Sequence, residues 1–388
     1  MSTPNSLSGW ARWNSTFKRL LGPSAALCAV ILFFSLVAPE SFCTVQNART
    51  LSAQSVVVVL GAIGMTFVVV GGGIDLSIGS VIALSSVVSA LMVRAGFSAG
   101  TAALIGCAVG LMVGCVNGFL VASARLPAFI ATLGTMGIAR GVAKWLANQS
   151  TIYPPEDWTS SLMAKNPDPA WLLLAPGVWI TIVIALAFGF VLSRTVFGAW
   201  VTSIGSNESA ARLCGVPVVR VRWTTYALCG LLAGVAGVLQ FHRLSGGDPT
   251  TANGKELEVI AAVVIGGAAL SGGFGTVGGS IVGAILMAAL ANGCNLVDWN
   301  SLGRWGVSTE MAQTLSSWFG SSGIPNYVQE ILVGVVIVIA ALAGGSPAGG
   351  GRGRAVAVPG HGVEPDVLAA GARRGVHAPN GRPGWPVR

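Results

Sequence analysis

Charged residues are scarce in this 388-residue chain: 22 are basic and 14 are acidic, together 9% of the sequence. A soluble globular domain has about 25% charged residues, so this composition excludes an ordinary soluble fold. The formal net charge is +8, but the basic residues form no face of the kind that binds nucleic acid. We therefore expect no nucleic-acid partner.

The residues that metal and nucleotide sites need are also missing. Only three histidines occur, at 242, 361 and 377, and the seven cysteines are scattered without a CxxC pair. No histidine-based metal site or catalytic triad can be assembled from them. The phosphate-binding pattern G-x-x-x-x-G-K-[ST] is absent, because Pro249 stands where Gly254-Lys255 would require a glycine. The sequence predicts a chain that is no enzyme, has no ATPase site of its own and binds no metal or cofactor.

Hydrophobic residues make up 53% of the chain and lie in long windows without charge. A membrane-spanning helix needs about 20 mostly apolar residues. The window 126–146 contains only Arg140 and Lys144 near its end, and 259–297 is too long for one helix, with a break at 271–275. Seven further windows each predict one helix: 20–39, 50–74, 76–93, 95–124, 169–193, 223–242 and 331–351. The fold class is therefore all-α: a polytopic membrane protein with about ten transmembrane helices, some of them broken.

The distribution of basic residues predicts the orientation. Arg12, Lys18 and Arg19 precede the first window, and basic segments stay in the cytoplasm. We expect a cytoplasmic segment 1–19, a transmembrane domain 20–343 and a tail 344–388. The tail is rich in Gly, Pro and Arg, so we expect it to be disordered and, with ten spans, cytoplasmic. The loop 194–223 then faces the cytoplasm and the loop 298–328 the outside.

A very short helix with both ends marked is predicted inside the loop 194–223. Ser206 or Asn207 is a suitable N-cap, Glu208 follows in the first turn, and Gly215 and Pro217 come after the end. An isolated helix of about eight residues is unstable in water. We interpret the segment either as a rigid knob held by a partner protein or as a plain surface turn.

An acidic residue, Asp75, lies between two apolar windows. It is flanked by Gly72-Gly73 and by Ser77. Irregular backbone at membrane depth requires burial in protein or a water-filled cavity, and a charge there indicates a functional site. Asp75 and Ser77 therefore either cap the next helix, line a translocation path, or do both.

Other polar residues within the windows serve either helix packing or the same path. These path candidates are Asn117, Thr132, Thr135, Asn292 and Asn295, and the predicted helix breaks are Gly72, Gly73, Gly272, Gly273 and Gly275.

Three segments resemble one family. Residues 205–216 are similar to its motif G-x-N-E-x-A-A-R-x-x-G-[IV]. Residues 72–80 resemble G-G-I-D-L-S-[VI]-G-[SA], and 256–276 resemble E-L-x-x-I-A-A-V-V-I-G-G followed by L-x-G-G-x-G-[ST]. The family is the ribose/xylose-type sugar permeases of bacterial ABC importers, also called the branched-chain amino acid/sugar permease superfamily. The segments occur in the family's order and spacing.

This resemblance implies a permease subunit in the bacterial inner membrane, surrounded by membrane lipid, that imports a monosaccharide. The implied partners are two ABC ATPase subunits that hydrolyse the ATP, a second permease subunit, identical or a sister, and a periplasmic sugar-binding protein. The family's coupling helix, which docks in a cleft of the ATPase, would comprise Gly205, Asn207, Glu208, Ala210, Ala211, Arg212 and Gly215. The loop 298–328 and the tail are longer than is usual in the family, and Phe274 stands where the family often has a basic residue.

Three alternatives remain open at this point. An ABC permease of the same superfamily could carry a branched-chain amino acid or a nucleoside. An ion-coupled secondary transporter would use Asp75 with Arg140 or Lys144 as coupling charges. A receptor or scaffold would move no solute at all.

Overall fold

The computed structural model describes residues 9–155, 158–164, 166–167, 170–297 and 323–344, with 308, 310, 311, 314, 317 and 318. These residues are largely helical; the described part contains one isolated β-bridge, Ile152 with Gly247, and no strand. The helices are α1 Gly9–Val37, α2 Pro39–Phe42, α3 Val45–Val70, α4 Ile78–Arg94, α5 Ala99–Gly118, α6 Ala128–Leu146, α7 Pro176–Arg194, α8 Val196–Ser206, α9 Glu208–Leu213, α10 Val218–Leu244, α11 Lys255–Ile265, α12 Val277–Leu296 and α14 Asn326–Gly344. A π-helical turn, η1 Phe119–Ser123, extends α5, and the 3-10 turns η2 Trp158–Met163 and η3 Ala170–Leu172 precede α7.

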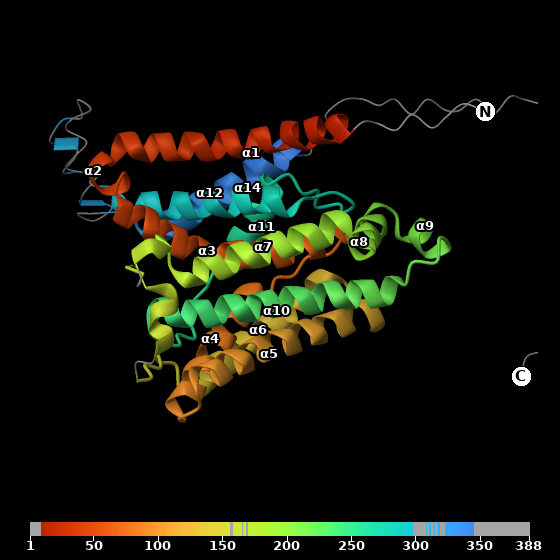
Figure 1. Cartoon of the computed structure of the whole chain (residues 1–388), viewed down its shortest axis with the longest axis horizontal. Coiled ribbons are helices and arrows are strands. Elements are labelled where there is room, and N and C mark those ends of the chain that lie inside the picture. Colours follow the sequence, from red (N-terminus) through yellow and green to blue (C-terminus); the bar gives the residue numbers. More distant parts are fainter. Residues whose placement is uncertain are drawn as a thin grey trace, which may run out of the picture. The chain divides into compact units, whose positions relative to one another are not determined.

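Helices α3 and α10 form the centre of the bundle. The long helices run roughly side by side, with α1 at one margin and α5 and α6 at the other (Figure 1). Helix α3 packs on α10, α12, α11 and α7, and α10 packs on α5, α3 and α4. The apolar stretch of α3 is 89% buried, against 22% for that of α7. Although the two helices are similarly hydrophobic, α3 is surrounded by other helices, whereas α7 lies on the outside of the bundle.

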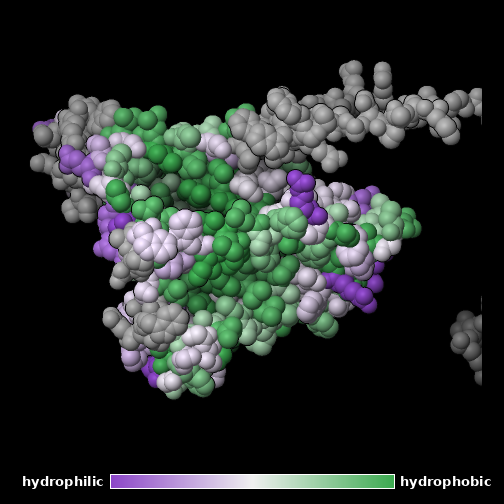
Figure 2. All heavy atoms as spheres, in the orientation of Figure 1, coloured by the Kyte–Doolittle hydropathy of each residue, from purple (hydrophilic) through white to green (hydrophobic). Residues whose placement is uncertain are grey.

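Hydrophobic side chains cover the middle of the face seen in Figure 2, and hydrophilic side chains gather towards its two ends. Large exposed apolar residues on the outer helices include Leu104 on α5, Ile138 on α6 and Leu186 on α7. Exposed apolar area of this extent would be unfavourable in water, whereas a lipid bilayer is its natural solvent. We call the end of the bundle that bears α8 and α9 the α9 end.

Among the described residues, five helical segments are long and apolar enough to cross a membrane: Val45–Val70, Ala99–Ser123, Pro176–Arg194, Val218–Leu244 and Val277–Leu296. Helices occupy all nine predicted windows, with two in 259–297, but several of these helices fall outside this length criterion. Helix α11 has only 11 residues, which is about 16 Å at 1.5 Å per residue, roughly half of a hydrocarbon core. The window 259–297 therefore contains one half-length and one full-length helix rather than two equal spans.

Small residues let the central helices approach closely. Gly110 and Gly114 on α5 face Gly230 on α10, and a Cβ on Gly114 would lie 2.9 Å from the Gly230 Cα atom. Gly279 on α12 likewise packs against the Gly266 carbonyl group at the end of α11. Close backbone contact of this kind is typical of helix packing in lipid.

Three element boundaries differ from the sequence-based expectation. Helix α1 begins at Gly9, inside the segment 1–19, and α10 begins at Val218, while α8 fills much of the loop 194–223. The reason is that charges mark where a segment leaves the lipid, whereas a helix continues as far as its hydrogen bonds do. Most of the loop 298–328 and the tail from 345 onward lie outside the described residues; α14 begins at Asn326, before that loop's expected end.

Candidate functional site

The predicted break after α3 is present. Helix α3 ends at Val70, Gly72 has a positive φ of 78°, and α4 begins only at Ile78. The Asp75 carboxylate accepts hydrogen bonds from the Ser77 backbone N–H at 2.9 Å and from the Ser77 hydroxyl at 2.6 Å. Asp75 therefore forms an Asx turn onto Ser77, the N-cap residue of α4, whose own side chain makes no capping hydrogen bond; the two roles expected of Asp75 stay predictions.

A chain of buried polar side chains extends from this cap. The Asn117 amide on α5 donates to the Ser77 hydroxyl at 2.9 Å, and its Oδ1 atom accepts from the Thr135 hydroxyl on α6 at 2.7 Å. Asp75 is 1% exposed and Asn117 is fully buried. Because an unpaired polar group at such depth costs about 1–3 kcal/mol, these bonds fix the mutual position of α4, α5 and α6.

Two further hydroxyl groups approach the break at the Ile74 carbonyl oxygen. Thr132 on α6 and Tyr226 on α10 both lie 3.4 Å from it, although the Thr132 hydroxyl bonds more closely, at 2.8 Å, with the Ala128 carbonyl group. A Cβ on Gly73 would overlap the Tyr226 hydroxyl, which explains the glycine. Tyr226 was not among the predicted site residues. It is one of three tyrosines in the chain and lies in an apolar window, and a polar hydroxyl in such a window could have indicated a site.

The structure does not bring Asn292 and Asn295 to this cluster. The Asn292 amide donates to Gln54 on α3 at 3.4 Å, and Asn295 accepts from Gln329 on α14 at 2.8 Å. Both lie towards the C-terminal end of α12, whose N-terminal end is the one that packs near the breaks. The 15 helical rises between Val277 and Asn292 correspond to about 22 Å.

The three sequence motifs meet at the α9 end. A Cβ on Gly205, in the last turn of α8, would overlap the Val70 carbonyl oxygen at the end of α3. That same oxygen accepts a 2.8 Å hydrogen bond from the Gly273 backbone N–H. Gly272 has a φ of 86°, and a Cβ on it would lie 2.9 Å from the Cα atom of Gly72. The turn between α11 and α12 therefore touches both the break after α3 and the end of α8. Gly275 packs on Val70 as well.

Helix α9 is a six-residue helix with the predicted caps. The Asn207 side chain accepts a hydrogen bond from the Ala210 backbone N–H at 2.9 Å. At the other end Gly215 has a φ of 81°, and the Val216 N–H donates to the Ala211 carbonyl oxygen, which closes the helix in a Schellman arrangement. These caps stabilise a helix that would otherwise be too short to form.

Glu208 makes two ion pairs, one of which attaches α9 to the bundle. Glu208 pairs with Arg212 on its own helix and with Arg222 on α10, both at 2.7 Å. The hydrogen bonds from Arg222 and then Arg212 hold the pKa of the Glu208 carboxyl below its usual range. A carboxyl with a lowered pKa stabilises the fold at neutral pH, and this contribution is lost as pH falls through the lowered value. The pairs therefore persist at physiological pH.

The outer surface of α9 is apolar at its end. Leu213 is 90% exposed, and Ala210 and Cys214 are also exposed. Ala211, in contrast, is 5% exposed and packs within the chain, so of the two alanines only Ala210 is available to another protein. Leu213 was not among the predicted site residues, because its apolar character alone did not distinguish it from a core residue.

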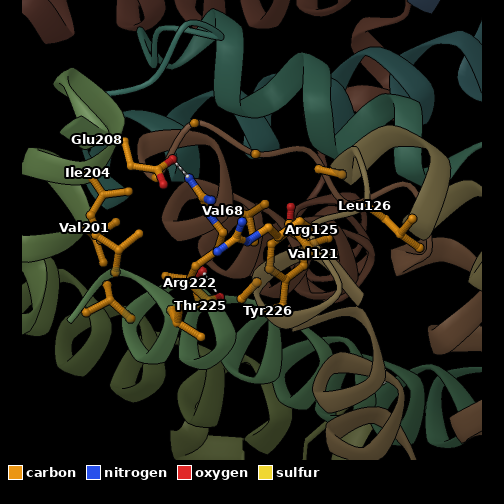
Figure 3. Close-up of a pocket in the computed structure, with 18 of the residues that line it drawn as sticks. Val68, Val121, Arg125, Leu126, Val201, Ile204, Glu208, Arg222, Thr225 and Tyr226 are labelled. Atoms are coloured by element: carbon orange, nitrogen blue, oxygen red, sulfur yellow. Dashed lines mark hydrogen bonds and ion pairs between the residues drawn. The ribbon is translucent and has the colours of Figure 1, made fainter. Parts of the chain in front are cut away.

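A cavity of about 410 Å³ joins α9 to the break. Its lining runs from the Glu208–Arg222 pair to Gly72 and Tyr226, with Arg125 beside it. Figure 3 shows the ion pair at one side of this cavity and Arg125 and Tyr226 around it. The cavity thus extends from a segment that protrudes from the bundle to the glycines of the break after α3.

Arg140, which the ion-coupled alternative pairs with Asp75, points to other groups. Its guanidinium donates to the carbonyl oxygens of Pro249 at 3.0 Å and Thr251 at 2.8 Å. Asp75 takes its hydrogen bonds from Ser77 and Asn117. The structure therefore offers no support for an Asp75–Arg140 pair.

Comparison with known proteins accounts for this arrangement. The model of the family described as "Branched-chain amino acid transport system / permease component" matches residues 47–341. The chain belongs to this permease family. The permease is 35% identical over 317 residues to the ribose import permease protein RbsC of Escherichia coli K12, covering 82% of this chain and 91% of that one.

Two further relatives show the same extent of similarity. The L-arabinose ABC transporter permease protein AraH of Azospirillum brasilense is 34% identical, over 76% of the permease and 87% of the relative. The ribose import permease protein RbsC of Bacillus subtilis is 34% identical, over 83% and 91%. No solved structure matches the permease. The matched residues include the break after α3, α9 and the turn between α11 and α12, so the predicted resemblance is confirmed.

Proposed function

We propose that the permease is the membrane-spanning subunit of a bacterial ABC importer for a monosaccharide of the ribose or arabinose kind. The names of its relatives support a monosaccharide as the transported solute. The observation that supports the mechanism is that the capped helix α9 protrudes from the bundle and is bonded to α10. The partners in this proposal are two ABC ATPase subunits, a second permease subunit and a periplasmic sugar-binding protein. The permease performs no catalysis; its partners hydrolyse the ATP.

The proposal includes ten membrane segments in the inner membrane: α1, α3, α4, α5, α6, α7, α10, α11, α12 and α14. Helices α4 and α11 enter from a break or an irregular segment and span only part of the bilayer. The α9 end faces the cytoplasm, and both termini are cytoplasmic. This orientation follows the excess of basic residues on that side.

Rigid contacts give α9 a direct mechanical connection to the path. ATP-driven closure of the ATPases displaces α9, and a stiff interface transmits the displacement as a rigid-body movement. The Glu208–Arg222 pair passes this movement to α10, where Tyr226 borders the break. Gly205 contacts Val70 at the end of α3 directly. The hydrogen-bonded hydroxyls and amides around Asp75 line the path at this level, since a neutral sugar requires hydrogen-bond partners rather than charge.

A pull-down tests the assignment of α9. Tagged permease is extracted from native membranes in detergent, and the proteins bound to it are identified by mass spectrometry. We expect an ABC ATPase with the wild type and a loss of at least tenfold with Glu208→Arg, which places three like charges together at the foot of α9. Glu310→Arg is the matched control, since Glu310 is exposed and lies outside α9.

Two results would contradict the proposal. One is a folded wild-type permease that retains no ATPase under conditions mild enough to keep permease subunits together. The other is equal recovery of ATPase with Glu208→Arg and with the wild type, because the contact would then lie elsewhere.

A further inference from the structure

A second, larger cavity of about 710 Å³ lies where α3, α10, α11, α12 and α14 meet. It shares no lining residue with the cavity beside α9. Its volume is within the range of about 300–1,000 Å³ that is typical of small-molecule sites. The function proposed above leaves this cavity without a role.

The floor of the cavity is the start of a half-length helix. After α10 the chain passes Ser245, which has a φ of 52°, and continues without regular structure to α11 at Lys255. Part of this segment is buried in the bundle: Ala252 is 8% exposed, and a Cβ on Gly79 of α4 would lie 2.6 Å from the Ala252 carbonyl oxygen, whereas Thr250 and Asn253 are exposed. Val259, one turn into α11, packs against Gly61 in the buried middle of α3.

An irregular segment that leads into a half-length helix needs partners for its backbone polar groups. Irregular chain at membrane depth is tolerated only where it is buried in protein or lines a polar cavity. The segment before α11 borders the cavity and so meets this requirement. The N–H groups of Lys255, Leu257 and Glu258 donate to the carbonyl oxygens of Ala252 and Gly254, so the cavity offers a ligand side chains rather than the helix N-terminus.

The lining is rich in side-chain amides. Gln54 and Gln240 lie on α3 and α10, and Asn295 and Gln329 on α12 and α14. Amides offer donors and acceptors at once, which is what the hydroxyl groups of a sugar require. The charged lining residues are Arg243, Lys255, Glu256, Glu258 and Glu330, of which Lys255 and Glu258 pair with each other at 2.6 Å.

Hydrogen-bonding capacity is left over beside this lining. In the described part of the chain, Oε2 of Glu256 and Oδ1 of Asn292 are buried acceptors without a partner. Glu256 lines the cavity, and Asn292, which is 4% exposed, donates to Gln54 at 3.4 Å. Unpaired buried acceptors are costly, and hydroxyl donors of a ligand that reached them would relieve this cost.

We propose that the permease itself binds the transported monosaccharide in this cavity, at the start of α11 and against Gln54. This inference rests on the proposed function and adds to it an internal binding site separate from the Asp75 cluster. The site is a stopping point that selects for hydroxyl groups: a solute without a hydroxyl donor leaves the buried Oε2 atom of Glu256 unpaired and is rejected.

Direct binding tests the inference. The permease with its ATPase is placed in lipid nanodiscs without the binding protein, and D-ribose and L-arabinose are titrated to tens of millimolar with saturation-transfer NMR detection. ATPase alone and L-leucine serve as blanks. We expect saturable binding of at least one sugar to the wild type and binding at least tenfold weaker to Gln54→Leu.

The matched control is Gln46→Leu, two helical turns away on α3, where the side chain is exposed outside the cavity; it should bind as the wild type does. ATP-driven uptake with the binding protein is measured on the same preparations. Uptake of a sugar without saturable binding, or equal binding by wild type and Gln54→Leu, overturns the internal site alone. Absence of uptake of every monosaccharide overturns the proposed function together with it.

Discussion

At the scale of single residues, the buried carboxylate of Asp75 is held by several hydrogen bonds. It is almost fully buried, and both of its oxygen atoms lie within hydrogen-bond reach of Asn117, although the shorter bonds come from Ser77. These hydrogen bonds show how Asp75 can hold the break after α3. A role of Asp75 in the translocation path rests on the proposed function.

The capping role predicts a difference between two substitutions. Asp75→Ala removes the acceptor of the Ser77 N–H and of the Ser77 hydroxyl and leaves these two buried donors unpaired, at about 1–3 kcal/mol each. Asp75→Asn keeps one oxygen for Ser77. We expect Asp75→Ala to lower the midpoint of thermal aggregation of the detergent-solubilised permease markedly, and Asp75→Asn to lower it much less.

Asp248→Ala is a control with the same local geometry. Asp248 accepts from the N–H of Thr250 at 2.8 Å and from its hydroxyl at 2.7 Å, but at an exposed position. Water can replace that carboxylate, so the loss should be small. If Asp75→Ala were as stable as Asp248→Ala, the cap would not be what holds the break.

The sequence predicts a site residue best where a polar side chain stands among apolar neighbours. Asp75, Ser77, Asn117, Thr132 and Thr135 are polar residues in apolar windows, and the structure brings all five together. Asn292 and Asn295 are also polar residues in an apolar window, but they lie away from this cluster. A polar residue within one window does not reveal which residues of other helices lie at the same depth in the bilayer. Gln54 and Tyr226 were missed since their partners come from distant parts of the chain.

At the scale of elements, glycines set how closely the helices pack. Gly278 and Gly279 are neighbours in the first turn of α12, yet a Cβ on Gly278 would meet nothing within 4 Å, whereas one on Gly279 would overlap the Gly266 carbonyl oxygen. The contact between α11 and α12 therefore depends on Gly279 and not on Gly278. The sequence alone does not distinguish the two glycines.

This pair gives a matched prediction. Gly279→Ala should destabilise the permease by about 1–3 kcal/mol through overpacking and lower its thermal aggregation midpoint. Gly278→Ala should leave the midpoint unchanged or raise it, because alanine favours a helix by up to about 1 kcal/mol over glycine. Equal midpoints for the two variants would contradict the close contact between α11 and α12.

Charge-free windows located the long helices because lipid penalises charge wherever a helix lies in the bundle. They could not give the length of α11 or the existence of α8. The start of α11 is set by contacts of Ala252 with Gly79 and of Val259 with Gly61, which join parts of the chain far apart in sequence. Helix α8 ends against Val70 for the same kind of reason.

At the scale of the whole permease, two cavities and a buried polar cluster lie along one bundle. The cavity beside α9 opens towards the proposed ATPase contact, the cluster around Asp75 holds the break, and the amide-lined cavity lies at the start of α11. This order suits a subunit in which a solute is received at one end and a partner acts at the other. An ion-coupled mechanism would leave α9 without a partner.

ATP-driven uptake measures the central claim most directly. The permease is reconstituted into liposomes with its ATPase and binding protein, and uptake of D-ribose, L-arabinose and L-leucine is followed with and without ATP and with an ionophore. We predict uptake of a monosaccharide that requires ATP, is insensitive to the ionophore and is lost with Glu208→Arg. Uptake that continues without the ATPase and collapses with the ion gradient would contradict the account, as would transport of L-leucine alone.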